Sequence, residues 1–371
     1  MSTLTQRELS PDELARFGAE IDDLRARTVA DLGERDARYI RRIYAAVRWS
    51  EFAGRALLMA GLIMPEGWLW VSWLAGAVIL GLSKILDNME LGHNVIHGQF
   101  DWMGDPRFNG KSFEWDIVGT ADNWRKTHNF KHHTYTNVHG MDDDIGYDVL
   151  RIFPEQRWTP AALFQPLYAV IFALLFQWGV AIQDLRVGRA FIGRITWRQL
   201  AREAAPTLRK SRRQLVKDYI VFPLLAGPAF WSVFLGNLLA NGIRNVWTYT
   251  VIFCGHFTAN AQTFPKGIVK NETRPQWYLR QILGSSNLSG SRALHVMTGN
   301  LSHQIEHHLF PDVPANRYAE MAPVVRDICR RYGVQYNTGS MVGQFSQVIW
   351  RILRHSFPSS PAPMRARAQT Q

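Results

Sequence analysis

Apolar and polar stretches alternate along this chain at lengths that suit a membrane. One apolar run covers about residues 43–64, and a second covers 68–87 after a turn at Pro65-Glu66-Gly67. A helix needs about 20 residues to cross the hydrocarbon core of a bilayer. The two runs therefore predict a hairpin of spanning helices. A buried helical hairpin in a soluble protein is the alternative.

Two further apolar stretches, 160–183 and 219–257, flank a strongly basic segment. That segment, 185–217, contains ten Lys or Arg and a single acid, Glu203. Since basic loops stay on the cytoplasmic side, we expect 185–217 and the polar segment 87–158 to share that side. Residues 160–183 would then lie in the interface or dip in and return.

The stretch 219–257 is interrupted by Asn241 and Gly242, which predicts two short spans, 219–238 and 243–258, joined by a tight turn. With the hairpin they make about four transmembrane helices. In the competing topology, 160–183 crosses the membrane and 219–257 is one span. The fold class predicted either way is an all-α integral membrane protein.

The ends of the chain are polar. Residues 1–42 predict a cytosolic helical segment whose first helix begins at a capping box, Ser10 with Glu13. The membrane domain is expected over 43–355, and the Ser- and Pro-rich residues 356–371 predict a disordered tail. The first 40 residues have no apolar core of the kind a signal peptide needs, so we expect internal segments to direct insertion.

Composition narrows the classes of function. The net charge is +11, and the mean hydropathy of −0.15 fits a few spans with a large aqueous part. We see no helix-turn-helix, zinc-finger or RNA-sheet motif, so the charge points to a membrane lipid surface and excludes nucleic acid as partner. Cys254 and Cys329 predict buried thiols in a reducing compartment.

Histidine is concentrated in three short windows. Eight of the 12 histidines fall within 17 residues, where about 0.5 is expected from the chain's average. They are His93 and His97; His128, His132 and His133; and His303, His307 and His308. Residues four apart share a helix face and can chelate one metal. Adjacent histidines diverge by about 100° and can serve two metals, so the pattern predicts a dinuclear site.

The ligand type limits the metal. Imidazole suits Zn, Cu, Fe and Ni, but a structural zinc site closes with four ligands, usually including Cys. The full pattern of carboxylate di-iron bundles, which combines Glu with Glu-x-x-His motifs from four helices, is absent. A histidine-rich pair of iron ions is the interpretation that remains. A rival is the inverted zinc-protease pattern H-x-x-E-H, which His303, Glu306 and His307 satisfy.

The segments LGHNVIHG, THNFKHHTYTN and SHQIEHHLFP resemble the three histidine boxes of the membrane fatty-acid desaturases. The flanking segments NVHGMDDDIGYDVLRI and LFPDVPANRYAEMAPVVRDICRRYGVQYNTG are most similar to bacterial acyl-CoA Δ9 desaturases, and the resemblance covers roughly residues 45–350. It implies a four-span fold with a cytosolic helical cap that holds two iron ions. It also implies metal ligation by the seven histidines 93, 97, 128, 132, 133, 307 and 308.

Other site residues are assigned with less support. We expect His303 as a ligand because it would share a face with His307, and Gln304 as a hydrogen-bond partner of a ligand. His256, at the end of an apolar run, matches an extra ligand of related desaturases. Asp142 and Asp143 are candidates to orient the second-box imidazoles. His139, His295 and His355 are expected to have no role at the metal.

The resemblance implies an O2-dependent desaturase that inserts a cis double bond into a long-chain acyl-CoA at the cytoplasmic side of a bacterial plasma membrane. A histidine-box hydroxylase is the alternative. Two electrons must come from outside, and no iron–sulfur, dinucleotide or cytochrome b5-like motif is present. We therefore predict a separate NAD(P)H-dependent oxidoreductase or ferredoxin-type donor. The basic segment 185–217 would either face the lipid headgroups, with Arg at the interface, or bind CoA phosphates or an acidic donor.

Overall fold

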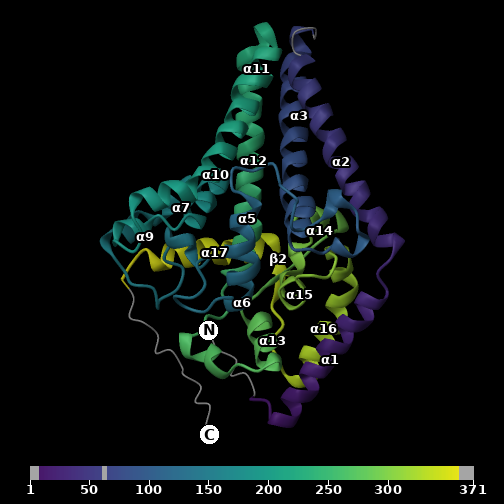
Figure 1. Ribbon diagram of the computed structural model, residues 1–371, viewed down its shortest axis with the longest axis vertical. Helices are drawn as coiled ribbons and strands as arrows, with labels where there is room; N and C mark the ends of the chain where they lie inside the picture. The colour runs from purple at the N-terminus through teal and green to yellow at the C-terminus, as the bar shows by residue number, and fades with distance from the viewer. Residues whose placement is uncertain (1–7, 61–64, 359–371) are drawn as a thin grey trace.

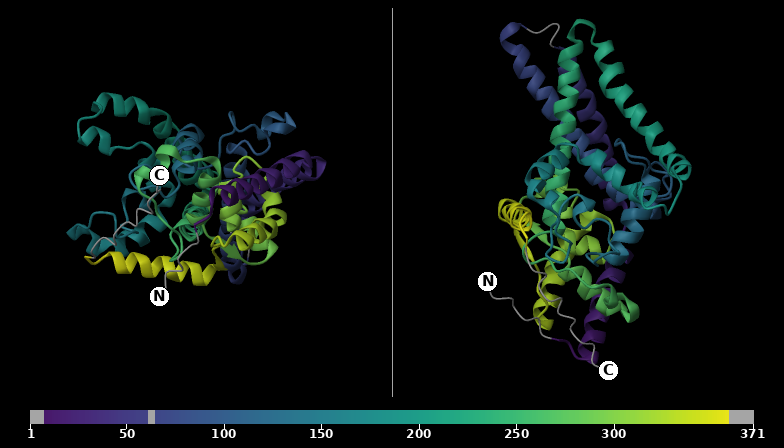
Figure 2. Two further views of the ribbon diagram at one scale, coloured as in Figure 1. Left: turned by 90° about the horizontal axis from the view of Figure 1, so that it is seen from below. Right: turned by 90° about the vertical axis from the view of Figure 1, so that its left-hand side faces the viewer.

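The computed structural model describes residues 8–60 and 65–358, and its regular structure is almost entirely helical. A long, narrow stalk rises from a broader cap (Figure 1), and the views from below and from the side agree on this shape (Figure 2). Four helical rods of the described chain form the stalk: α2 (Glu34–Met59), α3 (Glu66–Ile85), α10 (Trp197–Val216) continuing through η8 (Lys217–Val221) into α11 (Phe222–Leu225), and α12 (Phe230–His256).

The cap contains the remaining elements. Its longer helices are α1 (Pro11–Ala30), α7 (Gln165–Leu174), α8 (Phe176–Asp184), α13 (Arg274–Leu283), α16 (Tyr318–Tyr332) and α17 (Met341–His355). The shorter elements are η2 (Leu86–His93), α4 (Asn94–Ile96), η3 (Asp101–Met103), η4 (Pro106–Phe108), α5 (Ala121–Trp124), η5 (Arg125–His132), α6 (His133–Tyr135), η6 (Gly146–Asp148), η7 (Pro160–Phe164), α9 (Gly188–Phe191), η10 (Lys266–Asn271), α14 (Arg292–Met297), η11 (Leu301–His303), α15 (Gln304–Leu309) and η12 (Ala315–Arg317). Element η9 (Gly227–Ala229) instead belongs to the stalk, where it joins α11 to α12. Strands β1 (Asn287–Ser289) and β2 (Thr338–Ser340) pair in parallel.

Helix α12 corrects one prediction. It runs unbroken from Phe230 to His256, so separate helices over 219–238 and 243–258 are wrong. Asn241 does not interrupt the helix because its amide donates to the Asn237 carbonyl, one turn earlier, at 3.0 Å. The chain turns earlier, at η9, where Gly227 has a φ of 54°, a conformation that glycine adopts readily.

The segment 160–183 is not a straight helix. It forms η7 with α7, and then α8, with a bend of 97° between Pro160–Leu174 and Phe176–Asp184. The basic segment 185–217, expected as a loop, is mostly helix α10, which feeds the third rod of the stalk. The capping box at Ser10 is present at the start of α1. Residues 61–64 and 359–371, which include most of the predicted tail, lie outside the described residues.

Small residues let two rods of the stalk approach closely. A Cβ at Gly54 of α2 would lie 2.7 Å from the Leu80 backbone nitrogen of α3 and 3.0 Å from the Gly76 carbonyl oxygen. A Cβ at Gly76 would in turn lie 2.9 Å from the Leu58 nitrogen. Such small-residue contacts are typical of helices that pack in a membrane.

A buried ion cluster holds the rods together near the base of the stalk. Asp218 of η8 pairs with Arg55 of α2 at 3.2 Å and with Lys84 of α3 at 2.8 Å. Asn237 of α12 donates to the Asp218 carbonyl at 2.5 Å. The carboxylate therefore has two cationic partners, as a buried charge requires, and it joins the third rod to the other three.

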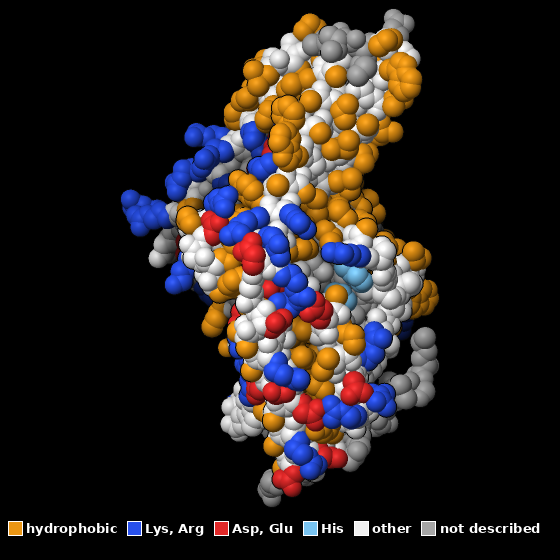
Figure 3. All heavy atoms as spheres, turned by 90° about the vertical axis from the view of Figure 1, so that its right-hand side faces the viewer, with side chains coloured by type: hydrophobic (Ala, Val, Ile, Leu, Met, Phe, Trp, Pro, Cys, Tyr) orange, Lys and Arg blue, Asp and Glu red, His pale blue; other side chains and the backbone are white. Residues whose placement is uncertain are grey.

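The surface of the stalk is apolar. By length and hydropathy, one continuous helix of the described chain, Gly67–Ile96, is suited to cross a membrane, or two if the bent pair counts as one span. In the face drawn in Figure 3, hydrophobic side chains cover the upper stalk, and Lys and Arg gather at its base.

Candidate metal centre

The first histidine box lies where a stalk rod enters the cap. Helix α3 continues through the π-helical stretch η2, which ends at His93, and then through α4 to His97. The two imidazole centroids are 4.6 Å apart. Isolated π-helical turns inside α-helices are frequent at functional sites. The rod therefore delivers two adjacent imidazoles to the centre of the cap.

The second box lies on another π-helical stretch. Element η5 carries His128 and His132, whose rings stack with centroids 4.8 Å apart. His133 begins α6 and points in a different direction, with its ring at 79° to that of His132. The adjacent histidines thus diverge, as the spacing predicts.

The third box lies on the short helix α15, beside the end of α12. The rings of His307 and His308 are 84° apart, so they too face different neighbours. The Nε2 atom of His308 is 3.2 Å from the Nε2 atom of His256, the last residue of α12. Two helices that are distant in sequence therefore meet at this pair.

The histidines form two groups. Within each group, one nitrogen atom of every ring lies within 4.8 Å of the others. The first group is His93, His97, His128 and His307, and the second is His132, His256 and His308. The His133 ring lies between them, 4.7 Å from that of His97 and 4.4 Å from that of His308.

Most of these rings have a buried nitrogen with no hydrogen-bond partner. Both nitrogens of the His133 ring lack a partner. So do the Nε2 atoms of His93, His97, His128, His132 and His307. Burying so many polar atoms unpaired is costly. Two sets of converging, unpaired imidazole nitrogens are what two metal ions would satisfy.

The opposite ring nitrogens are held by oxygen atoms. His128 Nδ1 lies 3.1 Å from Asp144 Oδ2, and His132 Nδ1 lies 3.0 Å from Asp142. His308 Nδ1 lies 3.0 Å from Gln281 Oε1. Such partners fix the ring orientation and leave Nε2 for a metal.

The contacts of the three acids 142–144 differ from those predicted. Asp142 contacts a second-box imidazole as expected, but Asp143 instead pairs with Lys131 and Arg186 at the surface. Asp144 takes the orienting position that we expected for Asp143. The three acids are consecutive in a turn, and only the turn geometry selects between them. The sequence prediction also did not include Gln281, because no motif marks this residue as a partner of a histidine.

His303 is the second departure. It lies in neither group, and its ring packs on that of His295 with centroids 4.6 Å apart. Its φ of −105° and ψ of 55° are not helical, so the four-residue spacing to His307 does not place the two on one face. Gln304 is the first residue of α15, and its Nε2 lies 2.9 Å from His256 Nε2.

The remaining histidines lie apart from both groups, as expected. His139 lies 3.6 Å from a carboxylate oxygen of Glu155, and His295 Nδ1 lies 2.7 Å from the Ser302 hydroxyl. His355 lies near the end of α17. None of the three is in a candidate metal group of the described chain.

The electrostatics favour neutral imidazoles. Burial, followed by the neighbouring imidazoles, holds the pKa of five rings well below the ordinary value: His97, His128, His133, His307 and His308. For His132, burial acts in the same direction but the Asp142 carboxylate outweighs it and raises the pKa. Neutral imidazole is the form that binds a metal.

Comparison with known proteins places this geometry in a family. The profile of the fatty acid desaturase family matches residues 68–340, which include all three boxes. This chain belongs to the fatty acid desaturase family. It is therefore an oxidoreductase of the desaturase type, and the resemblance seen in its sequence is confirmed.

Curated desaturases show the same relationship over most of the chain. The NADPH-dependent stearoyl-CoA 9-desaturase of Mycobacterium tuberculosis is 47% identical, over 93% of this chain and 80% of that protein. The sn-1 linoleoyl-lipid 6-desaturase of Synechocystis sp. is 25% identical over 78% of this chain and 80% of that protein. The Delta(5) fatty acid desaturase A of Dictyostelium discoideum is 23% identical over 70% of this chain and 58% of that protein.

The protease interpretation of the desaturase's third box does not fit the geometry. His303 and His307 do not converge, and the Glu306 carboxylate accepts hydrogen bonds from Asn287 Nδ2 at 2.8 Å and Tyr336 Oη at 2.9 Å. Burial raises the pKa of Glu306 to about 7. Glu306 is therefore part of the support for α15.

Proposed function

We propose that this desaturase uses two iron ions and O2 to insert a cis double bond, at Δ9, into a saturated long-chain acyl-CoA. The observation that supports it is the pair of histidine groups with unpaired nitrogens. Iron rather than another imidazole-binding metal is inferred from the family. When bound, the irons would supply the O2 activation that removal of hydrogen from an unactivated methylene requires.

The donor set fits two metal ions. The first group would hold one ion and the second group the other, with His133 between them in reach of either. Gln304 would then be a hydrogen-bond partner of the ligand His256, and His303 would not be a metal ligand. Asp142, Asp144 and Gln281 hold the rings in place, so that the donor nitrogens are set before a metal arrives.

The overall reaction sets what else the protein needs. Two neighbouring methylenes lose two hydrogen atoms, O2 becomes two waters, and two electrons with two protons come from outside. The relative in M. tuberculosis is named as NADPH-dependent. We propose that a separate NAD(P)H-dependent oxidoreductase or ferredoxin-type protein supplies the electrons to this chain.

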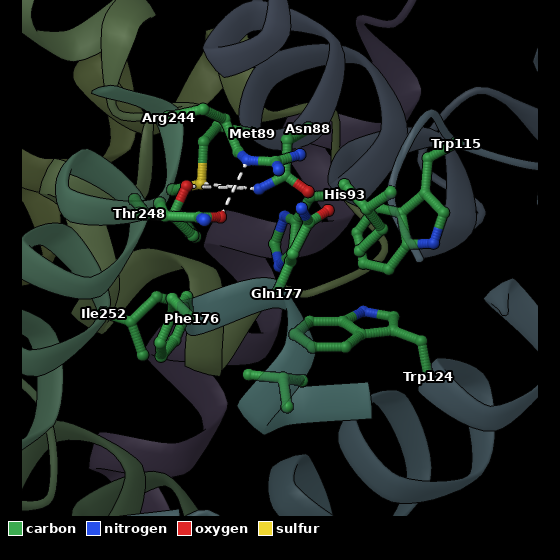
Figure 4. A pocket seen from close by; sticks show the side chains of 14 residues that line it. Asn88, Met89, His93, Trp115, Trp124, Phe176, Gln177, Arg244, Thr248 and Ile252 are labelled. Carbon is green, nitrogen blue, oxygen red and sulfur yellow. Dashed lines mark hydrogen bonds between the residues drawn. The ribbon is translucent and has the colours of Figure 1, made fainter. Parts of the chain in front are cut away.

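A narrow cavity beside the first group suits an acyl chain (Figure 4). Its volume is about 30 Å³, far less than a long acyl chain needs. It is lined largely by apolar side chains next to His93, among them Trp115, Ile117, Trp124, Phe176, Val180 and Ile252. Because it is so narrow, binding of an acyl chain must move these walls apart, and the walls then exclude water from the reacting methylenes.

A second pocket suits the phosphates of CoA. It is open, about 450 Å³, and lined by four basic residues of the α10–η8 rod, Arg209, Lys210, Arg213 and Lys217. Lys210 and Lys217 contact Glu114 and Asp116. The guanidinium groups of Arg209 and Arg213 have no ion-pair partner in the described chain. Trp115 lines both pockets, so a head group here could lead its acyl chain toward His93.

The stalk is proposed to be the membrane part. Its four rods would cross as two hairpins, and the bent pair α7–α8 would lie in the interface without crossing. The basic residues at the base of the stalk would face the cytoplasm, which places the metal centre on that side of a bacterial plasma membrane.

The test is production of an unsaturated acid. The chain would be expressed with an NADPH-dependent reductase in a bacterium that lacks desaturases, and fatty acids would be analysed by gas chromatography–mass spectrometry with derivatisation of double bonds. We expect a Δ9 monounsaturated acid from the wild type and none from His307→Ala. His139→Ala is the matched control and should retain the product.

Other products would overturn the proposal. A hydroxylated acid would assign the chain to the hydroxylases, and a double bond at another position would refute Δ9. Purified wild-type protein with about one zinc and no iron per chain would refute the di-iron centre.

A further inference from the structure

Helix α17 has an unusual surface. Its exposed stripe consists of Val342, Gly343, Ser346, Ile349, Trp350, Leu353 and Arg354, with Phe357 just beyond its end. Val342 is 79% exposed, Trp350 68% and Phe357 59%. A surface helix of a soluble protein places polar residues on such a stripe, whereas only one residue of this one is charged.

The neighbouring helix α16 shows the ordinary arrangement. It is also 15 residues long and amphipathic, but its outward residues include Glu320, Arg326, Arg330 and Arg331. Both helices belong to the same cap and both bury one side. The apolar outer side of α17 is therefore a property of this helix and not of the cap as a whole.

The buried side of α17 shows that the helix is firmly seated. Val348 and Ile352 are buried in the main hydrophobic cluster. The Gln165 amide of α7 donates to the Ile352 carbonyl at 2.5 Å. At the C-terminal end, Trp158 Nε1 donates to the Ser356 carbonyl at 2.9 Å, and Arg151 donates to the His355 carbonyl at 3.1 Å. The exposed apolar stripe is thus fixed facing outward.

Helix α7, which is in contact with α17, also exposes apolar residues. Helix α7 packs on both α17 and the stalk helix α12. Its own outward residues Leu167, Val170, Ile171 and Leu174 are between 46% and 59% exposed. In Figure 1, α17 runs across the molecule below the stalk. In the side view of Figure 2 it is seen end-on at the edge of the cap.

We propose that α17 is an in-plane membrane helix, with its Val342–Phe357 stripe inserted into the cytoplasmic leaflet beside α7. The occupant of this surface is lipid because α17 packs on α7 and on the stalk helix α12, and both of these helices also expose apolar residues. Its edges carry groups suited to a headgroup region, since Trp350 and Trp158 are amphipathic and Arg354 and Arg157 are cationic.

The consequence is a fixed depth for the metal centre. Helix α17 packs on α12, and α12 ends at His256 of the second histidine group. A leaflet contact through α17 would hold that end of α12 at a set distance from the headgroups. This inference rests on the proposed membrane location of the stalk, so its test must separate the two.

Site-directed spin labelling provides that test. Nitroxides would be attached in lipid nanodiscs to Trp350→Cys on α17, to Leu238→Cys on the exposed side of α12, and to Arg330→Cys on α16. Cys254 and Cys329 are buried, and the wild-type protein measures any labelling of them. Accessibility to O2, which concentrates in lipid, is compared with accessibility to a water-soluble nickel complex.

We expect the label at 350 to resemble the label at 238, with O2 accessibility several-fold above that of the nickel complex, and the label at 330 to show the reverse. Nickel accessibility at 350 equal to that at 330 would overturn the α17 inference alone. Low accessibility of 350 to both reagents would mean a protein contact, such as a second copy, and would also overturn it. If 238 itself were accessible to nickel, the proposed membrane stalk would fail. Retained iron content in each variant verifies its fold.

Discussion

At the scale of single residues, an oxygen behind the ring orients several of the imidazoles. The acidic run shows this most clearly, because two of its three consecutive carboxylates contact second-box imidazoles and the third does not. Asp142 contacts His132, Asp144 contacts His128, and Asp143 pairs with basic residues at the surface. Mutations of such orienting partners typically weaken metal affinity.

Adjacent alanine substitutions test this division. Asp144→Ala should weaken metal binding by about 10- to 100-fold, because His128 loses the acceptor that fixes its ring. Asp143→Ala should leave the affinity near that of wild type, because it removes only the ion pairs with Lys131 and Arg186 and no contact to an imidazole. Competition with a chelator, followed by iron determination, measures both. Equal losses would show that the whole turn, rather than Asp144, matters.

A second pair of substitutions tests the ligand set. His256→Ala removes one of three rings of the second group and should lower the iron content toward one ion per chain. His303→Ala should keep two, because His303 packs on His295 outside both groups. Elemental analysis by mass spectrometry gives the metal-to-protein ratio. Iron loss in His303→Ala with retention in His256→Ala would reverse our assignment.

At the scale of elements, the rods of the stalk depend on close backbone approach and on buried charges that satisfy one another. Gly54 and Gly76 permit the contact between α2 and α3, and the Asp218 cluster joins the third rod. The two π-helical stretches η2 and η5 carry five of the histidines together with the short helices that follow them. Of the two stretches, η2 continues the stalk helix α3, and α12 ends at His256, so the stalk positions His93, His97 and His256.

The same Gly→Ala substitution at two positions separates the effect of helix packing on stability from the effect of helix propensity. Gly54→Ala should lower the melting temperature in detergent, since its Cβ would meet backbone atoms of α3, and overpacking typically costs about 1–3 kcal/mol. Gly242→Ala in α12 meets no atom within 4 Å and should be neutral or stabilising by about 0.5–1 kcal/mol. Thermal unfolding followed by circular dichroism compares the two. A Gly54→Ala protein as stable as wild type would refute close packing there.

At the scale of the whole molecule, the proposed membrane location of the apolar stalk would divide the chain between two solvents. The turn at η9 lies at the far end of the stalk, and α16 lies on the cap (Figure 1). Membrane crossing by the four rods would place these two regions on opposite sides. That arrangement puts the histidines, the basic pocket and the electron donor on one side.

Cysteine labelling in intact cells tests the topology. A membrane-impermeant maleimide should label Pro228→Cys in η9 without lysis, and Arg330→Cys in α16 only after lysis. The native cysteines are buried, which keeps the background low. Labelling of position 330 in intact cells would invert the orientation. Labelling of both positions would contradict the crossing itself.

Local patterns in the sequence were sufficient to predict which histidines gather, because residues four apart share a helix face and adjacent residues diverge wherever the chain is helical. The apolar runs likewise predicted a helical stalk, and Ser10 with Glu13 predicted the start of α1. Tertiary structure alone decided the exceptions. His303 leaves the set because its backbone is not helical, Asp144 replaces Asp143 because of a turn, and Asn241 stays within α12 because a neighbouring turn satisfies its amide. The outward apolar stripe of α17 also depends on which side of the helix the fold buries, and that is set by contacts with α7 and α12, far away in the sequence.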